Sequence, residues 1–516
     1  MRRYLIFWFL LIFAFGILIF RLVQLSIFEG ERNRFLADTQ RIRLRKISAP
    51  RGLIYDRNNI PLVSNWPIYR LCQKDKCEII SRQKALELQA EGEDADLLLS
   101  IGRHYLLGES SAHLLGYLSE ATRQEVEKKE YGLGDLVGRG GVEEQNDEIL
   151  RGLDGQQLIE TDTGGRILRL LGEKEPVAGK DLHLTIDSQL QKTAYQALNG
   201  KKGAVVAQNP ETGEILALVS SPSFDPEDLN EAVLNNPDKP FFNRAISGAY
   251  PPGSTFKVVV STAALEEGKI TPETKIEDPG VITIGKYTYS NWLFTQRGRT
   301  EGLINLIRAI ARSTDTFFYK VGEMVGANKL LEWAKMFGLG RNSGIDLPGE
   351  NNGFLPDPQE GNWFLGNTYH LAIGQGSLGL TPLQVNQMTG VIASKGKICQ
   401  PYVVQKEGGE SQNCSIIKIK PETIKAVTEG MKGACSPGGT AAVFFDYKVH
   451  GENIACKTGT AEFNDPKGRT HAWFTAFAPA ENAEIVVTAL VEAGGEGSTV
   501  AAPIVKKVLE EYFRSP

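Results

Sequence analysis

The sequence predicts an α+β fold for residues 181–516, behind a β-rich domain at 29–180 and a membrane anchor at 1–28. Three observations support this prediction. Residues 4–20 carry no charge, hairpin-like segments follow at 46–65, and strand-like runs flank a mostly helical middle in the last region. Strands at both ends of a domain with helices between them favour one antiparallel sheet that has helices on its faces.

The uncharged run at 4–20 is long enough for a transmembrane helix. A cleaved signal peptide is the alternative, but the run exceeds the usual apolar core of a signal peptide and no A-x-A site follows it. We therefore expect an uncleaved, single-pass anchor. The arginines on its two sides nearly balance under the positive-inside rule. Because long domains translocate largely regardless of such charges, we expect the remainder of the chain to lie outside. These arginines are Arg2 and Arg3 before the run, and Arg21, Arg32 and Arg34 after it.

The region 29–180 is predicted to contain mainly β-structure. The segment KISAPRGLIYDRNNIPLVSN at 46–65 combines turn residues with β-type runs, which is typical of hairpins. Residues 80–130 are more charged and are predicted to be helical. A glycine-rich joint at 137–155 leads through a second β-rich patch to the domain boundary, which we place near residue 180.

The region 181–516 begins with TIDSQLQKTAYQAL at 185–198, an amphipathic helix that Asp187 or Ser188 would cap. The segment GAVVAQNPETGEILALVSS at 203–221 is typical of a hairpin with its turn at NPETG. Near the C-terminus, IACKTGTAEF, HAWFTAFAPA and EIVVTALVEAGG are three strand-like runs, and a helix is expected at about 499–513.

The composition excludes several classes of protein. The net charge is -5, from 57 Lys+Arg and 62 Asp+Glu without a long block of one sign, so we expect no nucleic-acid partner. The basic stretch RIRLRK at 41–46 alternates with apolar residues and is interpreted as one solvated strand face. Neither CxxC nor HExxH occurs, and the six histidines are scattered, so no zinc site is expected.

The six cysteines suit either side of a membrane. Cys72 and Cys77 flank a short polar segment, and Cys399 and Cys414 bracket a predicted hairpin, so both pairs could form disulfides in an oxidising compartment. The remaining two are either a third pair or two buried thiols. They are Cys435 and Cys456.

The stretch YPPGSTFKVVV at 250–260 places Ser254 and Lys257 at the start of a helix. Two prolines and a glycine end any preceding helix, so Ser254 is expected at or next to the N-cap, with Gly268 as the stop. Residues three apart share a helix face, which brings the amine within reach of the hydroxyl. The positive potential of the helix start disfavours an ammonium. Lys257 is therefore predicted to be a neutral amine that takes the proton of Ser254.

This Ser-x-x-Lys spacing alone is weak evidence, since its ordinary interpretation is an N-cap serine followed by a surface lysine. Two further motifs favour chemistry. The triplet Ser-Thr-Asp at 313–315 lies between an apolar helix and an aromatic run, although it could also be only a helix cap. The strand-like KTGT at 457–460 offers a cation and hydroxyl donors to a carboxylate, and its glycine permits close approach of another backbone. The bare spacing recurs at Ser81/Lys84, Ser394/Lys397 and Ser415/Lys418.

Ser-x-x-Lys, Ser-x-Asp and Lys-Thr-Gly in this order resemble the motifs of the serine penicillin-recognising enzymes. The chain is more similar to the class B penicillin-binding proteins, from about residue 46 to its end. The Ser-x-Asp variant and the tail HAWFTAFAPAENAEIVVTALVEAGGEG resemble the elongation type (penicillin-binding protein 2) more than the division type. The resembling segments are APRGLIYDRN, VGRGGVEEQNDEILRG, TIDSQLQ, NPETGEILALVSSPSFDP, GQGSLGLTPLQ and AWFTAFAP.

The resemblance implies a serine transpeptidase domain at 181–516, with a five-stranded antiparallel sheet flanked by helices. It implies a pedestal, or dimerisation-type, domain at 29–180. The implied activity is a D,D-transpeptidase that cross-links peptidoglycan stem peptides in cell elongation and is the target of β-lactam antibiotics. The implied location is the cell (inner) membrane, with the catalytic domain extracytoplasmic.

The family's roles can be carried over residue by residue. Ser254 would attack the penultimate D-alanyl carbonyl, with Lys257 as its base, and D-alanine would leave. Ser313 would relay a proton toward the leaving amine. Asp315 stands where the family usually has Asn and would hold Lys257 or the substrate amide. A carboxylate there raises the pKa of Lys257, which alters the charge balance of the site. The amine of a second stem peptide then resolves the acyl-enzyme.

The KTGT strand supplies the remaining contacts in this resemblance. Lys457 would keep the site positive, and Gly459 would leave room for the substrate backbone. Thr458 and Thr460 would bind the terminal carboxylate of the donor peptide or of a β-lactam. The N–H groups of Ser254 and Thr460 would form the oxyanion hole.

Three further expectations concern the surroundings of the site. Gln375 would line the cleft, or else belongs only to a glycine-rich turn before a helix at Pro382. Trp292 and Trp473 could wall the cleft, although buried core is the usual place for tryptophan. Between Lys257 and position 313 there is no His or Cys, so no metal is expected at the site, and no cofactor is implied.

Other functions remain as alternatives. A division-type transpeptidase, a membrane-tethered serine β-lactamase or a D,D-carboxypeptidase would share the three motifs. A β-lactam sensor or a catalytically silent scaffold belongs to a different class, and a Ser-His-Asp hydrolase is disfavoured because no G-x-S-x-G occurs. In the resembling family, the pedestal contacts a polytopic glycosyltransferase of the SEDS family and other elongation-complex proteins, so such partners are expected here.

Overall fold

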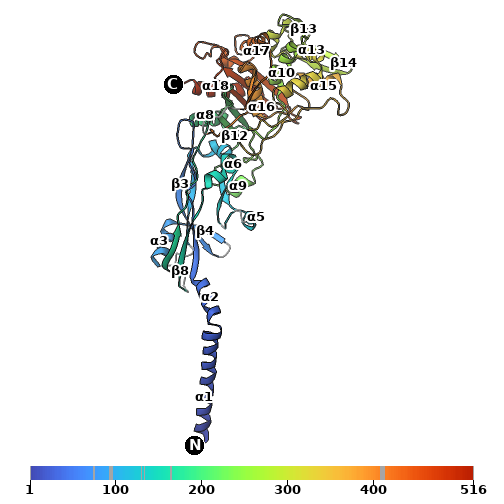
Figure 1. Cartoon of the computed structure of the whole chain (residues 1–516). Coiled ribbons are helices and arrows are strands. Elements are labelled where there is room, and N and C mark those ends of the chain that lie inside the picture. The colour runs from blue at the N-terminus through green and yellow to red at the C-terminus, as the bar shows by residue number, and fades with distance from the viewer. Residues whose placement is uncertain are drawn as a thin grey trace.

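The computed structural model arranges the chain as a long rod with a globular head (Figure 1). The N-terminal helix lies at one end, the β-rich pedestal follows it, and the domain that contains the C-terminus lies at the other end. The structure describes residues 2–73, 76–91, 97–128, 131–132, 134–162, 166–406 and 413–514, except for the side chains of 36–40, 72–73 and 76.

The first helix, α1 (Arg2–Val23), continues through a π-helical turn, η1 (Gln24–Phe28), and is followed by α2 (Gly30–Arg41). The stretch Arg2–Phe28 is long and apolar enough to cross a membrane, with a mean hydropathy of 2.6 and no buried share. Apolar side chains that pack against no other part of the described chain need an apolar solvent. The helix is therefore a single-pass membrane anchor.

The pedestal is built from small sheets (Figure 1). One has the order β1-β8-β9, a second β4-β3-β5, and two pairs are β6-β7 and β10-β2. The basic stretch predicted as a strand is β1, which confirms that prediction. The strands of these four small sheets are β1 (Ile42–Ile47), β2 (Ile54–Tyr55), β3 (Val63–Gln73), β4 (Lys76–Ile80), β5 (Leu97–Tyr105), β6 (Tyr117–Glu120), β7 (Leu136–Arg139), β8 (Gly155–Thr161), β9 (Ile167–Lys174) and β10 (Leu182–His183).

The prediction that residues 80–130 are helical is only partly right. The segment contains α3, but it also contains the strand β5, which pairs antiparallel with β3 from Val63↔Tyr105 to Leu71↔Leu97. Leu97 and Tyr105, at the two ends of β5, are buried where the strand pairs with β3, so tertiary pairing outweighs helix propensity. The helices of the pedestal are α3 (Arg82–Glu91), η2 (Gly108–Ser111), α4 (Ala112–Leu115), α5 (Arg123–Glu127), α6 (Gly141–Gln145) and α7 (Asp147–Arg151).

A buried network of ion pairs joins two segments of the pedestal, APRGLIYDRN at 49–58 and VGRGGVEEQNDEILRG at 137–152. Glu143 is fully buried and accepts from Arg51 Nε at 2.8 Å and from Arg103 Nε at 2.7 Å. Arg51 also donates to Asp147, 2.7 Å away, and Tyr131 donates to the other oxygen of Asp147 at 2.9 Å. Because buried charges are tolerated only when they are paired and hydrogen-bonded, these residues fix how the two segments pack.

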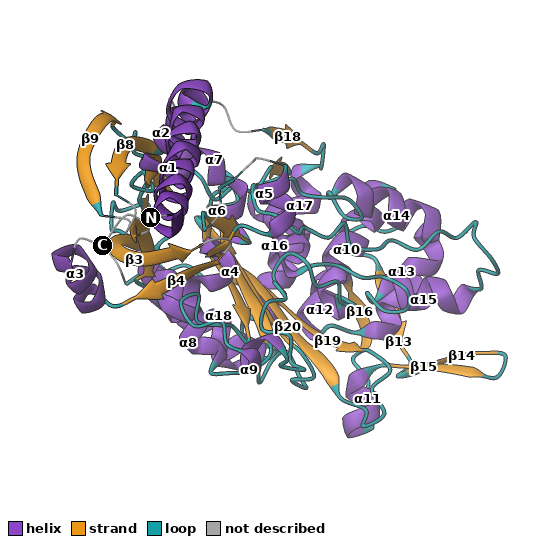
Figure 2. Ribbon diagram, turned by 90° about the horizontal axis from the view of Figure 1, so that it is seen from below, coloured by secondary structure: helices purple, strands orange, loops and turns teal. Residues whose placement is uncertain are grey.

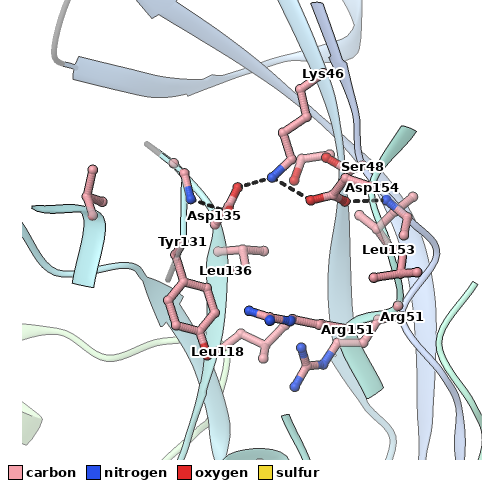
Figure 3. Close-up of a pocket in the computed structure, with 17 residues that line it drawn as sticks. Lys46, Ser48, Arg51, Leu118, Tyr131, Asp135, Leu136, Arg151, Leu153 and Asp154 are labelled. Atoms are coloured by element: carbon pink, nitrogen blue, oxygen red, sulfur yellow. Dashed lines mark hydrogen bonds and ion pairs between the residues drawn. The ribbon is translucent and has the colours of Figure 1, made fainter. Parts of the chain in front are cut away.

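A cavity of about 420 Å³ lies beside this network (Figure 3). Lys46 bridges Asp135 and Asp154 across it, and Arg151 stacks over the ring of Tyr131. None of the residues predicted to carry chemistry lines this cavity. This cavity is therefore a feature of the pedestal rather than a guide to the reactive site.

The two domains join where β10 pairs in parallel with β2. The buried carboxylate of Asp56 accepts from Ser188 Oγ at 2.7 Å, and Asp187 caps the helix α8 by accepting from Leu190 N at 2.8 Å. The sequence predicted either Asp187 or Ser188 as the cap of this helix, and the structure shows that it is Asp187. The boundary near residue 180 remains a prediction, since β10 at 182–183 pairs with a pedestal strand.

The C-terminal domain contains the antiparallel five-stranded sheet in the order β12-β11-β21-β20-β19. The predicted hairpin at 203–221 and the three C-terminal strands all belong to it, which confirms the α+β prediction. Along β20 the buried side chains alternate between the two faces. The strands are β11 (Gly203–Gln208), β12 (Ile215–Ser221), β19 (Ala455–Glu462), β20 (Thr470–Ala478) and β21 (Ile485–Val491).

Helices cover both faces of this sheet (Figure 2). One face packs on α8 and α18 through Phe474 and Ala476 of β20. On the other face, Trp473 and Phe477 join the core formed by α10, α13, α16 and α17. The helices are α8 (Ser188–Leu198), α10 (Lys257–Glu266), α12 (Leu306–Arg312), α13 (Asp315–Val325), α14 (Ala327–Met336), α15 (Leu365–Ala372), α16 (Pro382–Ala393), α17 (Pro421–Ala434) and α18 (Ala501–Tyr512).

Short elements connect these helices and strands. They are α9 (Glu231–Leu234), η3 (Gly253–Phe256), β13 (Lys275–Asp278), β14 (Val281–Ile284), β15 (Tyr287–Ser290), α11 (Trp292–Arg297), β16 (Gly302–Asn305), β17 (Lys397–Cys399), β18 (Cys414–Ile416) and η4 (Ala442–Phe444).

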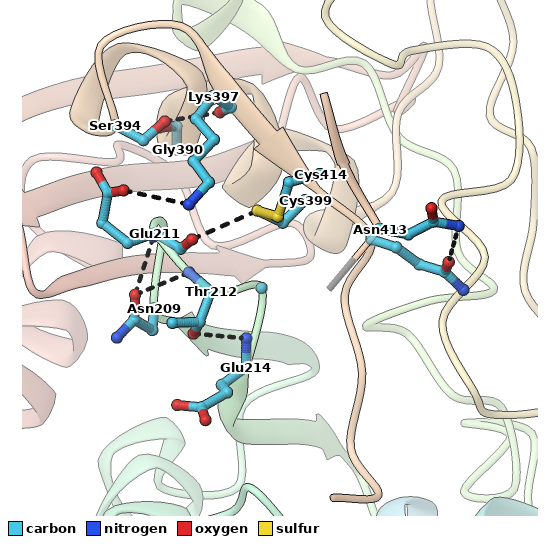
Figure 4. Close-up of a disulfide and its surroundings, with 12 residues drawn as sticks. Asn209, Glu211, Thr212, Glu214, Gly390, Ser394, Lys397, Cys399, Asn413 and Cys414 are labelled. Atoms are coloured by element: carbon cyan, nitrogen blue, oxygen red, sulfur yellow. Dashed lines mark hydrogen bonds and ion pairs between the residues drawn. A yellow bond between two sulfur atoms is a disulfide. The ribbon is translucent and has the colours of Figure 1, made fainter. Parts of the chain in front are cut away.

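Two disulfides lie in the C-terminal domain. Cys399 and Cys414 are register partners on β17 and β18, beside the loop of Glu211 and Thr212 (Figure 4). Cys435 and Cys456 also form a disulfide, so the alternative of two buried thiols is excluded. The pairing of Cys72 with Cys77 falls on a side chain outside the described residues, although the two are backbone partners on β3 and β4.

Candidate active site

Ser254 lies inside the short 3-10 turn η3, where its side chain is half-buried. The prediction that it caps the following helix is wrong, because α10 begins only at Lys257 and its N-cap residue is Phe256. The 3-10 turn arises because Gly253 has φ +55 and donates its N–H to the carbonyl of Gly374 at 2.9 Å. Gly268 ends the helix with φ +63, as predicted.

Lys257 is fully buried, and its amine is held by the turn at 313–315. Its Nζ donates to the Ser313 carbonyl at 2.9 Å, to Ser313 Oγ at 3.2 Å and to Asp315 Oδ1 at 2.6 Å. Within the described chain it has no hydrogen bond to Ser254. The predicted contact is displaced because a carboxylate is a stronger partner for a buried amine than a neutral hydroxyl is.

Burial lowers the pKa of Lys257, and the charge and hydrogen bond of Asp315 counteract that effect only in part. The direction agrees with the predicted neutral amine, but its cause is desolvation by the core rather than the helix start. The ring of Phe318, one turn after Asp315 on α13, lies 5.0 Å from Lys257 Nζ. Sequence reasoning missed this ring, although the aromatic run after the triplet was a signal for it.

Ser313 joins the two lysines of the site. It ends α12 in a left-handed conformation with φ 55, which points its hydroxyl back toward the buried amines. Its Oγ lies 3.2 Å from Lys257 Nζ and 2.9 Å from Lys457 Nζ. A hydroxyl can donate one hydrogen bond while it accepts another, so this group can pass a proton between the amines.

Lys457 is the second fully buried lysine. Besides the Ser313 contact, its Nζ donates to the carbonyl of Thr458 at 2.9 Å. Burial lowers its pKa well below the usual value, the charge of Lys257 lowers it further, and Asp315 opposes both. Two buried amines beside one carboxylate cannot all be charged at low cost, so the site favours a lysine without its proton.

The KTGT segment lies on β19, at the edge of the sheet next to η3. A Cβ built on Gly459 would lie 3.0 Å from the carbonyl oxygen of Pro252, so the glycine allows the strand to touch the serine turn. The hydroxyl of Thr458 is 3.1 Å from that of Thr440, a contact that the sequence did not reveal because Thr440 belongs to no motif. Thr460 is exposed.

The backbone of Thr460 faces the site. Its carbonyl accepts a long hydrogen bond, 3.5 Å, from Nε2 of Gln375. The N–H and C=O groups of one strand residue point to the same side, so the Thr460 N–H also points away from β20. Gln375 therefore lies beside the strand, on the turn that precedes the helix α16 at Pro382.

The two tryptophans have different places. Trp473 is fully buried and donates to the carbonyl of Pro251 at 2.9 Å, so it supports the serine turn from the core. Trp292 is half-buried and donates to the carbonyl of Arg312 at 2.9 Å. Among the described residues, no group of His, Cys, Asp and Glu side chains is placed to hold a metal ion.

The geometry thus brings together the serine turn, the 313–315 turn and β19, three segments far apart in the sequence. Comparison with known families gives two matches. Residues 203–510 match the penicillin binding protein transpeptidase domain, and residues 79–184 match the penicillin-binding protein dimerisation domain.

Individual proteins agree with the family models. The chain is 30% identical to the peptidoglycan D,D-transpeptidase MrdA of Acinetobacter baumannii, over 98% of this chain and 86% of that protein. Among solved structures, the complex between PBP2 and MreC from Helicobacter pylori has a TM-score of 0.79 at 27% identity, covering 92% of this chain and 99% of that chain. A structure on the coordination of polymerization and crosslinking by a peptidoglycan synthase complex has a TM-score of 0.79 at 30% identity, covering 100% and 99%.

Proposed function

The chain belongs to the penicillin-binding protein transpeptidases, and on that premise we propose which of its residues carry the reaction. The protein is a membrane-anchored peptidoglycan D,D-transpeptidase, which cross-links stem peptides through a serine acyl-enzyme. The observation that carries the residue assignment is the convergence of three sequence motifs on one hydroxyl, that of Ser313.

Ser254 is the proposed nucleophile. It lies in the turn next to β19, and its hydroxyl has no hydrogen bond to any described residue, so it is available to attack a carbonyl carbon. Oγ bonds to the penultimate D-alanyl carbon of the donor, the amide bond breaks, and D-alanine leaves with one proton. A β-lactam is attacked in the same way, but its leaving amine stays tethered within the opened ring.

Lys257 is the proposed base and Ser313 the proposed proton relay. Burial lowers the pKa of Lys257, which provides an amine that can take the Ser254 proton. Lys257 and Ser313 are 3.2 Å apart, so that proton can continue through the Ser313 hydroxyl to the leaving nitrogen. Asp315 keeps the Lys257 amine in place through its 2.6 Å contact.

The edge of β19 is the proposed binding strand. Lys457 supplies positive charge, and the hydroxyls of Thr458 and Thr460 are donors for the terminal carboxylate of the donor peptide. Gly459 lets the strand lie against the serine turn. The outward N–H of Thr460, with that of Ser254, is suited to stabilise the oxyanion. Gln375 borders the same edge.

We propose that both folded domains lie outside the cytoplasm. Two disulfides in the C-terminal domain support this orientation, because such bonds persist in oxidising compartments. Protease added to intact spheroplasts should then digest the chain beyond residue 29. Protection of the whole chain until the membrane is broken would reverse the assignment.

We also propose partners in the elongation complex. Two similar solved structures support this proposal. One is PBP2 in complex with MreC, the other is a peptidoglycan synthase complex, and each similarity covers nearly the whole of this chain. The finer proposal is a polytopic SEDS-family glycosyltransferase beside α1 and the pedestal. Cross-linking from positions in α1 tests it, and the absence of any polytopic partner would contradict it.

Intact-mass spectrometry after incubation with a labelled penicillin tests the residue assignment. We expect one adduct on the native chain and on Ser377→Ala, an exposed serine two residues after Gln375, and none on Ser254→Ala. Full labelling of Ser254→Ala would reject the nucleophile. The adduct's lifetime separates the alternatives, because a serine β-lactamase would release the drug rapidly while a transpeptidase would hold it for hours.

A further inference from the structure

Glu462 is a carboxylate at the end of the binding strand that no described group neutralises. It is the last residue of β19, two positions beyond Thr460, and its side chain is exposed. In the described chain it has neither a hydrogen bond nor an ion pair. Side chains two apart on a strand share a face and are about 7 Å apart along it, so Glu462 lies on the same face as Thr460.

The opposite side of this position is formed by α13 and the end of α15. Gln375, which contacts Thr460, also donates its backbone N–H to the carbonyl of His370 at 2.8 Å. Tyr319 lies one turn after Asp315 on α13 and stacks on Tyr369, with ring centroids 5.1 Å apart. These contacts place His370 and Tyr319 across from the end of β19.

The charge of Glu462 reaches both of these residues. Burial raises the pKa of Tyr319, and the Glu462 carboxylate raises it further. Burial lowers the pKa of His370, and the same carboxylate opposes that shift without reversing it. His370 is therefore neutral at neutral pH and does not supply a cation to Glu462. The Glu462 carboxylate can therefore attract a cationic group that approaches this end of β19.

The reaction brings a cation to this place. The acceptor stem peptide provides a primary amine, which is an ammonium at neutral pH because such amines have pKa values near 10. A lysine beside Ser313 that carries its proton repels that ammonium, and the carboxylate of Asp315 is already engaged by Lys257. An acceptor that approaches along β19 encounters Glu462 as the carboxylate that has no partner.

We propose that Glu462 binds the ammonium group of the acceptor peptide and determines which acceptors are used, with Thr460, Gln375 and His370 bordering the same acceptor site. This proposal rests on the proposed function. After binding, the ammonium gives one proton to water. The nitrogen then attacks the acyl carbon, the C–N bond forms, the bond to Ser254 Oγ breaks, and the second proton passes through Lys257 to that oxygen.

The experiment measures cross-linked and hydrolysed products from one donor pentapeptide while the concentration of an acceptor tetrapeptide with a free side-chain amine is varied. The full-length protein in detergent is compared with Glu462→Gln, Glu462→Lys and Glu484→Gln. Glu484 is a matched control, because this exposed carboxylate lies before β21 at the opposite end of β20 from Thr470, the partner of Glu462. Acylation by labelled penicillin is measured for every variant.

We expect Glu462→Gln to raise the acceptor concentration for half-maximal cross-linking about threefold, the size typical of one exposed charge pair. Glu462→Lys should raise it about tenfold, and added salt should shrink both effects. Glu484→Gln should behave as the native chain. Penicillin acylation should remain within about twofold in all variants.

Two results would overturn the proposal: an unchanged acceptor dependence in both Glu462 variants, or a parallel loss of acylation and acceptor use, which indicates structural damage. A variant that fails to fold is recognised by its lost acylation. If Glu462→Lys fails to fold, the test relies on Glu462→Gln, because glutamine keeps the size and shape of the side chain. If the native chain itself is not acylated at Ser254, the proposed function fails instead, so the two failures are distinct.

Discussion

Asp315 Oδ1 lies 2.6 Å from the amine of Lys257, which makes a carboxylate the closest partner of the proposed base. The lysine is fully buried, whereas the Asp315 side chain is 16% exposed. The base is therefore subject to two opposing effects, with desolvation lowering its pKa and this carboxylate raising it.

Replacing the carboxylate by an amide tests this balance. In Asp315→Asn the opposing charge is gone, so the pKa of Lys257 should fall further and the amine should lose its proton at lower pH. We expect the pH at half-maximal penicillin acylation to move down by about 1–3 units, the size of one adjacent charge. Stopped-flow acylation between pH 5 and 10 measures it. An unchanged profile, or one that moves up, would show that Asp315 does not set the protonation of Lys257.

We expect Lys457 to lower the free energy of unfolding, although the proposed function requires this lysine. Its pKa is well below that of a free lysine, so folding works against the charged form. Below the unfolded-state pKa, and most strongly below the folded-state pKa, this lysine lowers the free energy of unfolding. Stability should therefore rise as the pH increases through that interval.

The variant Lys457→Met keeps an unbranched side chain, one atom shorter, and removes the charge. We expect its free energy of unfolding to stay within about 1 kcal/mol of the native value or to exceed it, because apolar replacements of buried charges are often neutral or stabilising. Acylation by penicillin should fall by at least about a hundredfold, the scale of one lost charge at a reacting site. Urea unfolding and intact-mass kinetics give the two values. A destabilisation above about 3 kcal/mol would contradict this account.

Gly459→Ala tests the contact between β19 and the serine turn. The new Cβ would lie 2.9 Å from Trp473 Cβ and 3.0 Å from both Pro252 O and Thr255 Cγ2. We expect the strand to move away from η3, a loss of about 1–3 kcal/mol of stability, and acylation slower by about a hundredfold. Gly172→Ala is the control, because a Cβ there meets nothing within 4 Å. Native acylation by Gly459→Ala would remove the steric argument.

The disulfide between Cys435 and Cys456 holds the strand residue that precedes Lys457. Its half-cystines are 21 positions apart, so replacing both by serine should cost about 3 kcal/mol of stability through the loss of loop closure. Because the bond also ties β19 to the end of α17, we expect acylation to slow as well.

The other disulfide supplies the matched comparison. Cys399 and Cys414, 15 positions apart, should contribute a similar amount to stability, about 3 kcal/mol. They lie on β17 and β18, a separate sheet from the one that contains β19, so their removal should leave the acylation rate unchanged. Equal effects of both double-serine variants on acylation would show that neither bond positions Lys457.

Most of the C-terminal domain could be predicted from local signals. The hairpin around Asn209 and the three C-terminal strands have clear apolar runs, and Asp187 has the spacing of a helix cap. The pedestal was harder, because β5 carries mixed residues whose pairing with β3 depends on contacts distant in the sequence. Residues 80–130 therefore looked helical by composition while tertiary pairing decided otherwise.

The members of the candidate site could be named from motifs, but most of their contacts could not. A cap at Ser254 was predicted because two prolines and a glycine precede it, whereas Gly253 bends the chain into a 3-10 turn instead. The resemblance implied that Asp315 holds Lys257 or the substrate amide, and the two side chains are in contact, but where α13 packs is encoded in no local pattern. Glu462 and Thr440 belong to no motif, so only the fold reveals their position.

The hydrogen bond from Ser188 to Asp56 spans 132 positions of the chain. During synthesis the acceptor leaves the ribosome long before the helix that needs it. A chain that starts at residue 181 would have to fold without that acceptor and without the strand that pairs with β10. The C-terminal domain therefore depends on a contact with residue 56, although every proposed reactive group lies at position 254 or later.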